Sequence, residues 1–232
     1  MSDPRARARE LARDAIARGD VTGWFEQLYV ESERDGFAIS WVDLAPNPYL
    51  VEWLERQPTP PRGRALVVGC GYGDDAEFLA GCGLEVAAFD VAPSAVARCR
   101  SRFPGSRVQY LVADALRPPA DWGASFDFVF EAYTIQVLHG EARTACARSI
   151  GGLVAPGGRL LVVARSRAED GPEGAMPWPL TRRELDAFGE HNALGEHDAH
   201  GEPGLDLVSL TELVEPGDPP VPRFVAEFVA RS

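Results

Sequence analysis

The stretch Ala65-Leu66-Val67-Val68-Gly69-Cys70-Gly71-Tyr72-Gly73-Asp74-Asp75 decides the fold of this chain. An apolar run of the kind that forms a buried strand leads into three glycines, and two acids follow where a helix should begin. Glycine lets the backbone turn sharply and approach a ligand closely. A buried strand, a glycine-rich turn and a helix, in that order, are typical of a fold that binds a nucleotide at the turn.

The two acids indicate which kind of nucleotide this turn accepts. A dinucleotide places its pyrophosphate on the helix N-terminus, and a third glycine there normally allows the close approach. Asp74 occupies that third position here, with Asp75 beside it. Two carboxylates would repel a pyrophosphate but tolerate a ligand that has no phosphate and carries positive charge. S-adenosylmethionine, with a sulfonium, an ammonium and a single carboxylate, is such a ligand.

Length and charge limit the class of protein further. With 232 residues, 45% of them hydrophobic and 25% charged, the chain is expected to form one soluble domain over residues 1–232. Its net charge of −12 argues against a nucleic-acid partner, which requires a basic face. The same acidity makes neutral or cationic small molecules the easier substrates to assume. Whether the chain acts as a monomer or a homodimer stays open.

The cysteines and the apolar runs suggest a compartment. Four cysteines are scattered without the spacing of a metal or disulfide motif, which favours free thiols. No apolar run is long enough to span a membrane, and none follows the N-terminal arginines as a secretory signal would require. We therefore expect a cytoplasmic protein with no membrane partner.

Apolar strands alternate with helices through most of the chain, which predicts a parallel sheet covered on both faces. Residues 1–60 are expected to form a helical lid, with an aromatic-rich flap at Trp24 to Asp43, and residues 61–232 the core. Thr181 and Glu184 match a capping box and should start a late helix. The expected core strands are Arg64 to Val68, Leu84 to Phe89, Val108 to Val112, Phe126 to Phe130 and Arg159 to Ala164, followed by a late pair at Leu205 to Leu213 and Phe224 to Val229. The expected helices are Arg5 to Arg18, Tyr49 to Arg56, Asp75 to Ala80, Pro93 to Phe103 and Glu141 to Leu153.

Acidic residues follow three successive core strands, at the edge where open parallel sheets bind ligands. Asp90 has roughly the spacing from the glycine turn at which an acid meets a ribose, so it is expected to accept hydrogen bonds from both ribose hydroxyls. Asp114, followed by Ala115, is placed to take the exocyclic amine of adenine. Glu131 ends the fourth strand near the sulfonium. The alternatives are a helix N-cap for Asp90 and a solvated loop acid for Glu131.

With these residues in place, the chain resembles a class I S-adenosylmethionine-dependent methyltransferase. The form Gly-Cys-Gly-x-Gly-x-Asp, which ends at Asp75, is similar to the thiopurine and halide/thiol methyltransferase branch. Val67 stands where many other members carry an acid. Matching segments are 86–90, 93–96, 126–131, 156–160, Trp41-Val42-Asp43 and Gly171 to Glu184.

The resemblance implies a Rossmann-like three-layer α/β sandwich, with a mostly parallel seven-stranded sheet and an antiparallel C-terminal strand. It also implies that Trp41 covers the donor. The donor-binding residues expected on all these grounds are Trp41, Gly69, Cys70, Gly71, Gly73, Asp75, Asp90, Val91, Asp114, Ala115 and Glu131.

The acceptor pocket is less defined by the sequence. Aromatic side chains stabilise a sulfonium, and Trp24, Phe25, Tyr133 and Trp178 are candidates, with ordinary packing as their alternative. His139 and Tyr133 are the candidates for a general base. His191, His197 and His200 lie close in sequence, but their spacing fits no zinc pattern, so no metal is expected.

Methyl transfer from a sulfonium is an in-line displacement, in which alignment matters more than acid–base chemistry. A thiol acceptor needs little help from a base, so the lack of a compelling base favours sulfur over an oxygen or nitrogen nucleophile. Two other classes remain: a nicotinamide-dependent oxidoreductase with the same strand–turn–helix unit, and a non-catalytic module that only binds the ligand.

Overall fold

The computed structural model describes residues 5–190 and 204–231. Seven strands form one sheet in the order β3-β2-β1-β4-β5-β7-β6. All neighbours pair in parallel except β7, which runs antiparallel to both β5 and β6. This arrangement confirms the predicted mixed sheet with an antiparallel strand near the C-terminus. The strands are β1 (Arg64–Val68), β2 (Glu85–Asp90), β3 (Gln109–Val112), β4 (Phe126–Ala132), β5 (Val154–Arg165), β6 (Leu205–Glu215) and β7 (Val221–Ala230).

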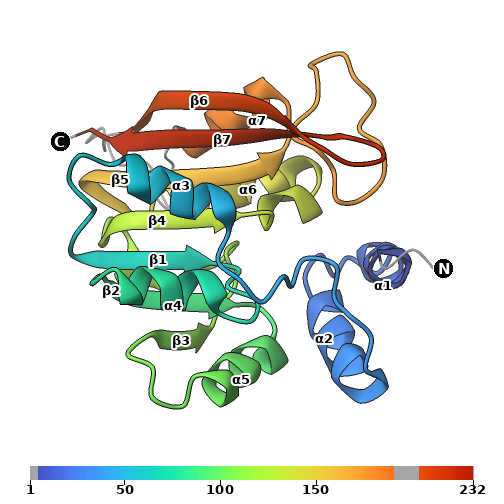
Figure 1. Cartoon of the computed structure of the whole chain (residues 1–232). Coiled ribbons are helices and arrows are strands. Elements are labelled where there is room, and N and C mark those ends of the chain that lie inside the picture. Colours follow the sequence, from blue (N-terminus) through green and yellow to red (C-terminus); the bar gives the residue numbers. More distant parts are fainter. Residues whose placement is uncertain (1–4, 191–203, 232) are drawn as a thin grey trace.

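Helices cover both faces of the sheet, which makes the three layers visible in Figure 1. One face packs against α3 (Pro48–Arg56), α4 (Asp74–Gly81) and α5 (Pro93–Arg102). The other packs against α6 (Gly140–Gly151) and the short α7 (Arg182–Leu185). The central strands are buried on both sides, and β1 is exposed only at Arg64, which explains their continuous apolar sequence.

The helices α1 (Ala6–Ile16) and α2 (Trp24–Asp35) do not join these layers but lie beyond the carboxyl ends of the strands (Figure 1). They form a separate hydrophobic cluster that includes Leu11 and Leu28 and also takes in Ala92, Val137 and Met176 from the core. The structure therefore holds a helical cover over the carboxyl edge of the sheet.

The structure adds detail to two local predictions and corrects a third. The aromatic-rich stretch from Trp24, expected as a flap, begins with the helix α2, which ends where Gly36 adopts a left-handed conformation. The predicted capping box at Thr181 and Glu184 is confirmed, and the helix it starts lasts 4 residues and continues as a 3-10 turn. Strand β5 begins earlier than expected, at Val154, and its pairing with β4 shifts register near Phe126. Pro156-Gly157-Gly158 therefore lies inside an irregular strand.

Within the described ranges, no helix is long and apolar enough to cross a membrane. The expected loop at residues 191–204, with His191, His197 and His200, lies outside the described residues except for Gly204. Among the residues that are described, no group of three or more histidine, cysteine or acidic side chains is placed to hold a metal ion.

Candidate active site

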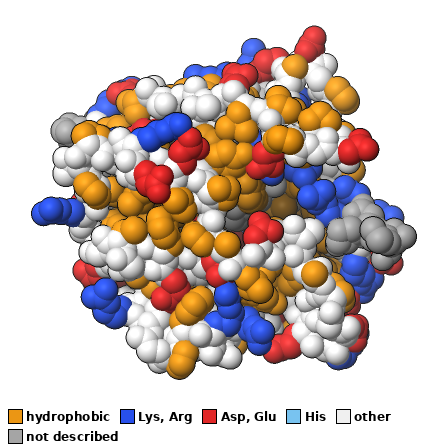
Figure 2. Space-filling model, viewed as in Figure 1, with side chains coloured by type: hydrophobic (Ala, Val, Ile, Leu, Met, Phe, Trp, Pro, Cys, Tyr) orange, Lys and Arg blue, Asp and Glu red, His pale blue; other side chains and the backbone are white. Residues whose placement is uncertain are grey.

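A cavity of about 660 Å³ lies at the carboxyl edge of the sheet, beneath α1 and α2. This volume is within the usual range of small-molecule sites, roughly 300–1,000 Å³. Figure 2 shows the molecule from the side of α3, with a hollow near the middle of this face and hydrophobic side chains around it. The cavity runs along the strand ends, so its two ends are lined by different strands and differ in chemistry.

One end, here called the glycine end, is lined by Gly69, Gly71, Asp75, Asp90 and Asp114. These residues follow β1, β2 and β3. Gly69 and Gly71 have φ values of +60° and +52°, in the left-handed region that favours glycine. A Cβ on Gly71 would have only the Tyr29 hydroxyl within 4 Å, at 3.5 Å, so the loop leaves open space for a ligand.

Asp90 is fixed by its own backbone surroundings. One carboxylate oxygen accepts a hydrogen bond of 3.0 Å from the backbone N–H of Gly71, and the other accepts one of 2.9 Å from Ala92. Burial raises the pKa of Asp90 to about 6, against the lowering effect of these hydrogen bonds. The N-cap alternative for Asp90 is partly realised, because Ala92 precedes α5, but Asp90 still lines the cavity.

The two adjacent acids have separate partners. Asp74 forms a two-pronged ion pair with Arg102, with N–O distances of 2.7 and 2.8 Å. Asp75 accepts a hydrogen bond of 2.6 Å from the backbone N–H of Asn47, the N-cap residue of α3. Burial raises the pKa of Asp75 to about 6. Both were expected from the sequence to be free negative charges, but Arg102 largely compensates the charge of Asp74.

The other end, here called the arginine end, is lined by Tyr133, Arg165, Glu215 and Arg223. Tyr133 follows β4, Arg165 and Glu215 end β5 and β6, and Arg223 lies near the start of β7. Arg223 forms an ion pair with Glu215, and its guanidinium lies over the ring of Tyr133, 4.8 Å from the centroid. Tyr133 itself has a φ of +66°, which is strained for a tyrosine. Of these residues, only Tyr133 was a candidate from the sequence.

The helical cover contributes a row of aromatic rings. Trp41 and Phe25 line the cavity, and the Trp41 indole N–H donates a hydrogen bond of 3.1 Å to the hydroxyl of the buried Tyr29. Phe25 and Trp41 meet edge to face, with centroids 6.2 Å apart. Tyr29 also lines the cavity. It was not named from the sequence, because the aromatic-rich segment that holds it has no clean periodicity.

Most predicted donor-binding residues line the cavity, namely Trp41, Gly69, Cys70, Gly71, Asp75, Asp90, Val91, Asp114 and Ala115. Gly73 and Glu131 do not. Gly73 starts α4 with a φ of +90°, and a Cβ there would lie 2.6 Å from the Tyr110 hydroxyl. Glu131 is fully buried and accepts backbone hydrogen bonds from Thr134 and Ile135, at 2.7 and 2.9 Å. By accepting these two bonds, the Glu131 carboxylate holds the backbone of the loop after β4 in place.

Two predicted acceptor residues are also absent from the lining. Trp24 is only 1% exposed, stacks on Phe25 at 3.8 Å and donates its indole N–H to the Val21 carbonyl. The packing alternative is therefore the correct one for Trp24. Trp178 packs against His139, with ring centroids 5.1 Å apart, and its backbone N–H donates to the Gln136 carbonyl in the loop after β4.

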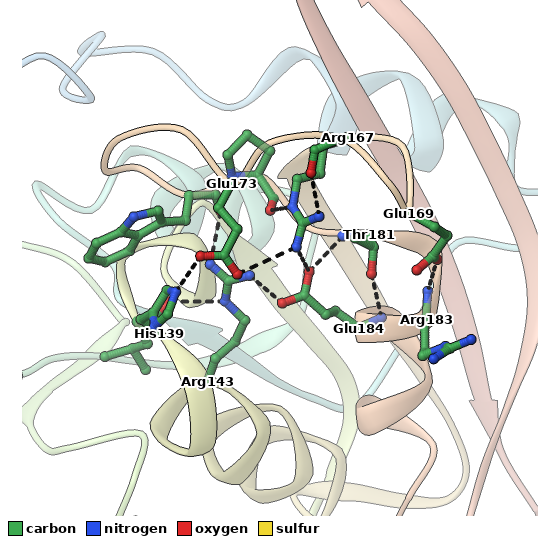
Figure 3. A network of polar contacts seen from close by, with 12 residues as sticks. His139, Arg143, Arg167, Glu169, Glu173, Thr181, Arg183 and Glu184 are labelled. Atoms are coloured by element: carbon green, nitrogen blue, oxygen red, sulfur yellow. Dashed lines mark hydrogen bonds and ion pairs between the residues drawn. The ribbon is translucent and has the colours of Figure 1, made fainter.

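His139 belongs to a network of ion pairs on the surface (Figure 3). Its Nε2 lies 2.7 Å from Glu173, which in turn is 3.8 Å from Arg167. Arg143, which is buried, donates to Glu184 at 2.5 Å and to the Leu138 carbonyl at 2.9 Å. This network joins the start of α6 to the cap of α7. His139 does not line the cavity and is not placed to act as a base there.

Comparisons with known proteins agree with this fold. Residues 65–158 match the family described as "Methyltransferase domain". The chain is 33% identical over 150 residues to a ubiquinone biosynthesis O-methyltransferase of Xanthomonas axonopodis pv. citri, covering 59% of this chain and 62% of that protein. It is 28% identical over 150 residues to a probable thiol methyltransferase 2 of Arabidopsis thaliana, covering 60% and 65%. The chain thus spans about three fifths of the length of these curated relatives.

Among solved structures, the N-methyltransferase NodS of Bradyrhizobium japonicum, in complex with S-adenosyl-L-homocysteine, is similar with a TM-score of 0.65 and 19% identity. The match covers 88% of this chain and 98% of NodS. At that identity the likeness establishes the fold alone. The fold is therefore the Rossmann-like fold of class I S-adenosylmethionine-dependent methyltransferases, and the matched family segment contains the glycine loop, Asp90, Asp114 and Tyr133.

Proposed function

We propose that this protein transfers the methyl group of S-adenosylmethionine to a small-molecule acceptor. The observation that carries the proposal is one continuous cavity with two chemically distinct ends, lined at one end by the glycine loop and Asp90 and at the other by Tyr133 and Arg165. Such a cavity has room for a donor and an acceptor side by side. The methyltransferase-domain match over residues 65–158 supports the same reaction.

The glycine end suits the donor. The open space at Gly71 lets the ligand approach the backbone, and the carboxylate of Asp90 keeps free lone pairs toward the cavity for ribose hydroxyls. Asp114, whose carboxylate also accepts the backbone N–H of Leu116 at 2.9 Å, stands beyond it after β3. When bound, the donor supplies an electrophilic methyl group on a positively charged sulfur.

The protein then has to hold the acceptor in line with the methyl group and to exclude water. Holding the reactants in line can lower the barrier by roughly 7–11 kcal/mol. The helical cover and the aromatic rings of Phe25 and Trp41 close the cavity from above. A ring face near the sulfonium stabilises it by roughly 0.5–2 kcal/mol.

We propose sulfur as the nucleophile, in line with the resemblance to the thiol methyltransferase branch and the 28% identity to a probable thiol methyltransferase. No histidine of the described ranges lines the cavity, and a thiol, with a pKa near 8.5, needs little help from a base. Oxygen is the second candidate, because several relatives are named O-methyltransferases.

The free cysteines are consistent with a cytoplasmic location.

Two measurements test the proposal. Calorimetry should show binding of S-adenosylhomocysteine and no comparable binding of NADH. Labelled donor, offered with matched panels of small thiols, phenols and amines, should yield a methylated thiol. If only phenols or amines were methylated, the proposal of sulfur as the nucleophile would be wrong, but the proposal of methyl transfer would stand. Binding of the donor product without turnover of any acceptor would favour the non-catalytic alternative, and preferential binding of NADH would overturn the proposal.

A further inference from the structure

The charges that line the cavity separate by sign along the sheet. Acids follow β1, β2 and β3, whereas arginines lie at the ends of β5 and β7. Arg165 is the last residue of β5 and Arg223 lies near the start of β7. Because β7 is antiparallel to β5, both reach the carboxyl edge of the sheet. The arginine end is thus positive in a protein whose net charge is −12.

Arg165 and Arg223 are direct cross-strand partners in the pairing of β5 with β7. They share the face of the sheet occupied by Val163 and Val225, so their side chains project to the same side. Like charges placed directly opposite on neighbouring strands destabilise a sheet. The repulsion between Arg165 and Arg223 costs stability at the wall of the cavity. Proteins keep such an unfavourable arrangement where a functional site requires it.

The two arginines differ in how they are compensated. Arg223 has Glu215 as its ion-pair partner, and Glu215 also accepts a hydrogen bond of 2.7 Å from the Tyr49 hydroxyl. Arg165 has no such partner: within residues 5–190 and 204–231 its guanidinium forms no hydrogen bond or ion pair. Burial, and then the positive charges of Arg5, Arg223 and Arg9, lower the pKa of Arg165. A half-buried positive charge without a partner, such as that of Arg165, is unfavourable, and a bound anion would remove this cost.

We propose that the acceptor is a small organic carboxylate whose anionic group binds Arg165 beside Arg223. This inference rests on the proposed function and names the substrate class of the same site. Arg165, Arg223 and Glu215 together carry one net positive charge, and Arg5, which also lines the cavity, adds to it, so this end attracts an anion. A guanidinium binds a carboxylate through two parallel hydrogen bonds, so the contact fixes orientation as well as affinity.

With the carboxylate held at the arginine end, the nucleophilic atom of the acceptor points back along the cavity, past Tyr133 toward the glycine end. The methyl group then moves from sulfonium to nucleophile, the electron pair of the old bond stays on the donor sulfur, and a nucleophile that enters as a thiolate brings no proton to remove. This placement explains why the arginines and the glycine loop lie at opposite ends of one cavity.

The test uses acceptor pairs that differ only in charge, namely 3-mercaptopropionate against 3-mercaptopropionamide and 3,4-dihydroxybenzoate against 3,4-dihydroxybenzamide. With labelled donor, the acid of a methylated pair should have a kcat/KM at least tenfold higher than its amide. Arg165→Gln should remove that preference by raising the KM for the acid, without a matching change for the amide. Equal rates for acid and amide, or an unchanged preference in R165Q, would overturn the inference while methyl transfer itself stood.

Two further variants make the result hard to attribute to misfolding. Glu215→Gln removes the negative charge beside Arg223, so it should strengthen the preference for the acid, opposite in sign to R165Q. Arg182→Gln, which removes an exposed arginine paired with Asp186 and outside the cavity, should change neither member of a pair. If neither pair of acceptors is methylated, the inference is tested by calorimetry, which measures the binding of benzoate and of benzamide to the protein saturated with adenosylhomocysteine. Benzoate binding that exceeds benzamide binding and is lost in R165Q supports the inference, and equal or absent benzoate binding overturns it.

Discussion

The carboxylate of Asp90, at the end of β2, accepts a hydrogen bond of 3.0 Å from the backbone N–H of Gly71, in the loop after β1. Two neighbouring strand ends are therefore joined by a single charged contact at the floor of the cavity. Burial, which raises the pKa of Asp90 to about 6, shows that the ionised form is held at some cost. A ligand hydroxyl that donates to this carboxylate would offset part of that cost.

Asp90→Asn should weaken adenosylhomocysteine binding by about 10- to 100-fold, because a hydrogen bond to a charged group contributes roughly 1.5–3 kcal/mol. Calorimetry on wild type and variant measures the change. Asp127→Asn is the matched control: Asp127 also accepts a backbone N–H, from Arg64 at 2.8 Å, but at the opposite edge of the sheet. A dissociation constant in D90N equal to that of the control would remove Asp90 from the site.

Gly71→Val should abolish adenosylhomocysteine binding and leave the fold intact. The added side chain would extend into the open space of the glycine end, and the positive φ adds strain of about 1–3 kcal/mol. Gly83→Val is the control, since Gly83 has a φ of +95° and nothing within 4 Å of a Cβ, but lies outside the cavity. Both variants should lose similar stability in urea, and only G71V should lose binding. Retained binding in G71V would mean that the loop does not contact the ligand.

Arg165→Gln should raise the midpoint of thermal unfolding, although it impairs acceptor binding. The substitution removes a half-buried charge that faces Arg223 across the strand pair and has no partner among the described residues. Arg159→Gln, on the same strand, removes the ion-pair partner of Glu227 and should lower the midpoint. If R165Q were as destabilising as R159Q, Arg165 would be a structural residue and not a binding one.

The glycine end could be predicted from the sequence because its determinants are local. The apolar run before Gly69, the proline at the start of α5 and the acid that ends β2 each act within a few residues of their own position. Their meeting follows from the rule that parallel strands present their carboxyl ends at one edge. The alternation of strands and helices, and with it the covering of both faces of the sheet, was predictable for the same reason.

The arginine end could not be predicted, because it depends on which distant strands become neighbours. Nothing local indicates that Arg165 and Arg223 will face each other across β5 and β7. The net charge of −12 pointed to neutral or cationic substrates, whereas the local field at this end has the opposite sign. Trp24 was misplaced for a similar reason: the side of α2 that faces the cavity is set by packing, and it presents Phe25 and Tyr29 instead.

Glu131 provides a prediction about pH. Burial raises its pKa from 4.5 to about 7, and Oε2 is buried without a hydrogen-bond partner within the described part of the chain. The folded protein therefore binds this proton more tightly than the unfolded chain does. The stabilising effect is complete below about pH 4.5 and is lost as the pH rises through 7. Between pH 5.5 and 8 the loss from this group should be about 2 kcal/mol.

Glu131→Gln should remove that pH dependence. The amide oxygen still accepts from Thr134 and Ile135, and any cost of its buried NH2 group is the same at every pH. Urea unfolding at pH 5.5 and 8 measures the difference: the free energy of unfolding of wild type should fall by about 2 kcal/mol more than that of E131Q. Asp75 and Asp90, whose pKa values are also raised, remain in both proteins and cancel. The exposed Glu55→Gln should behave as wild type. Parallel pH profiles for wild type and E131Q would show that Glu131 stays in one protonation state throughout, and that the loop after β4 is held without a titrating group beneath it.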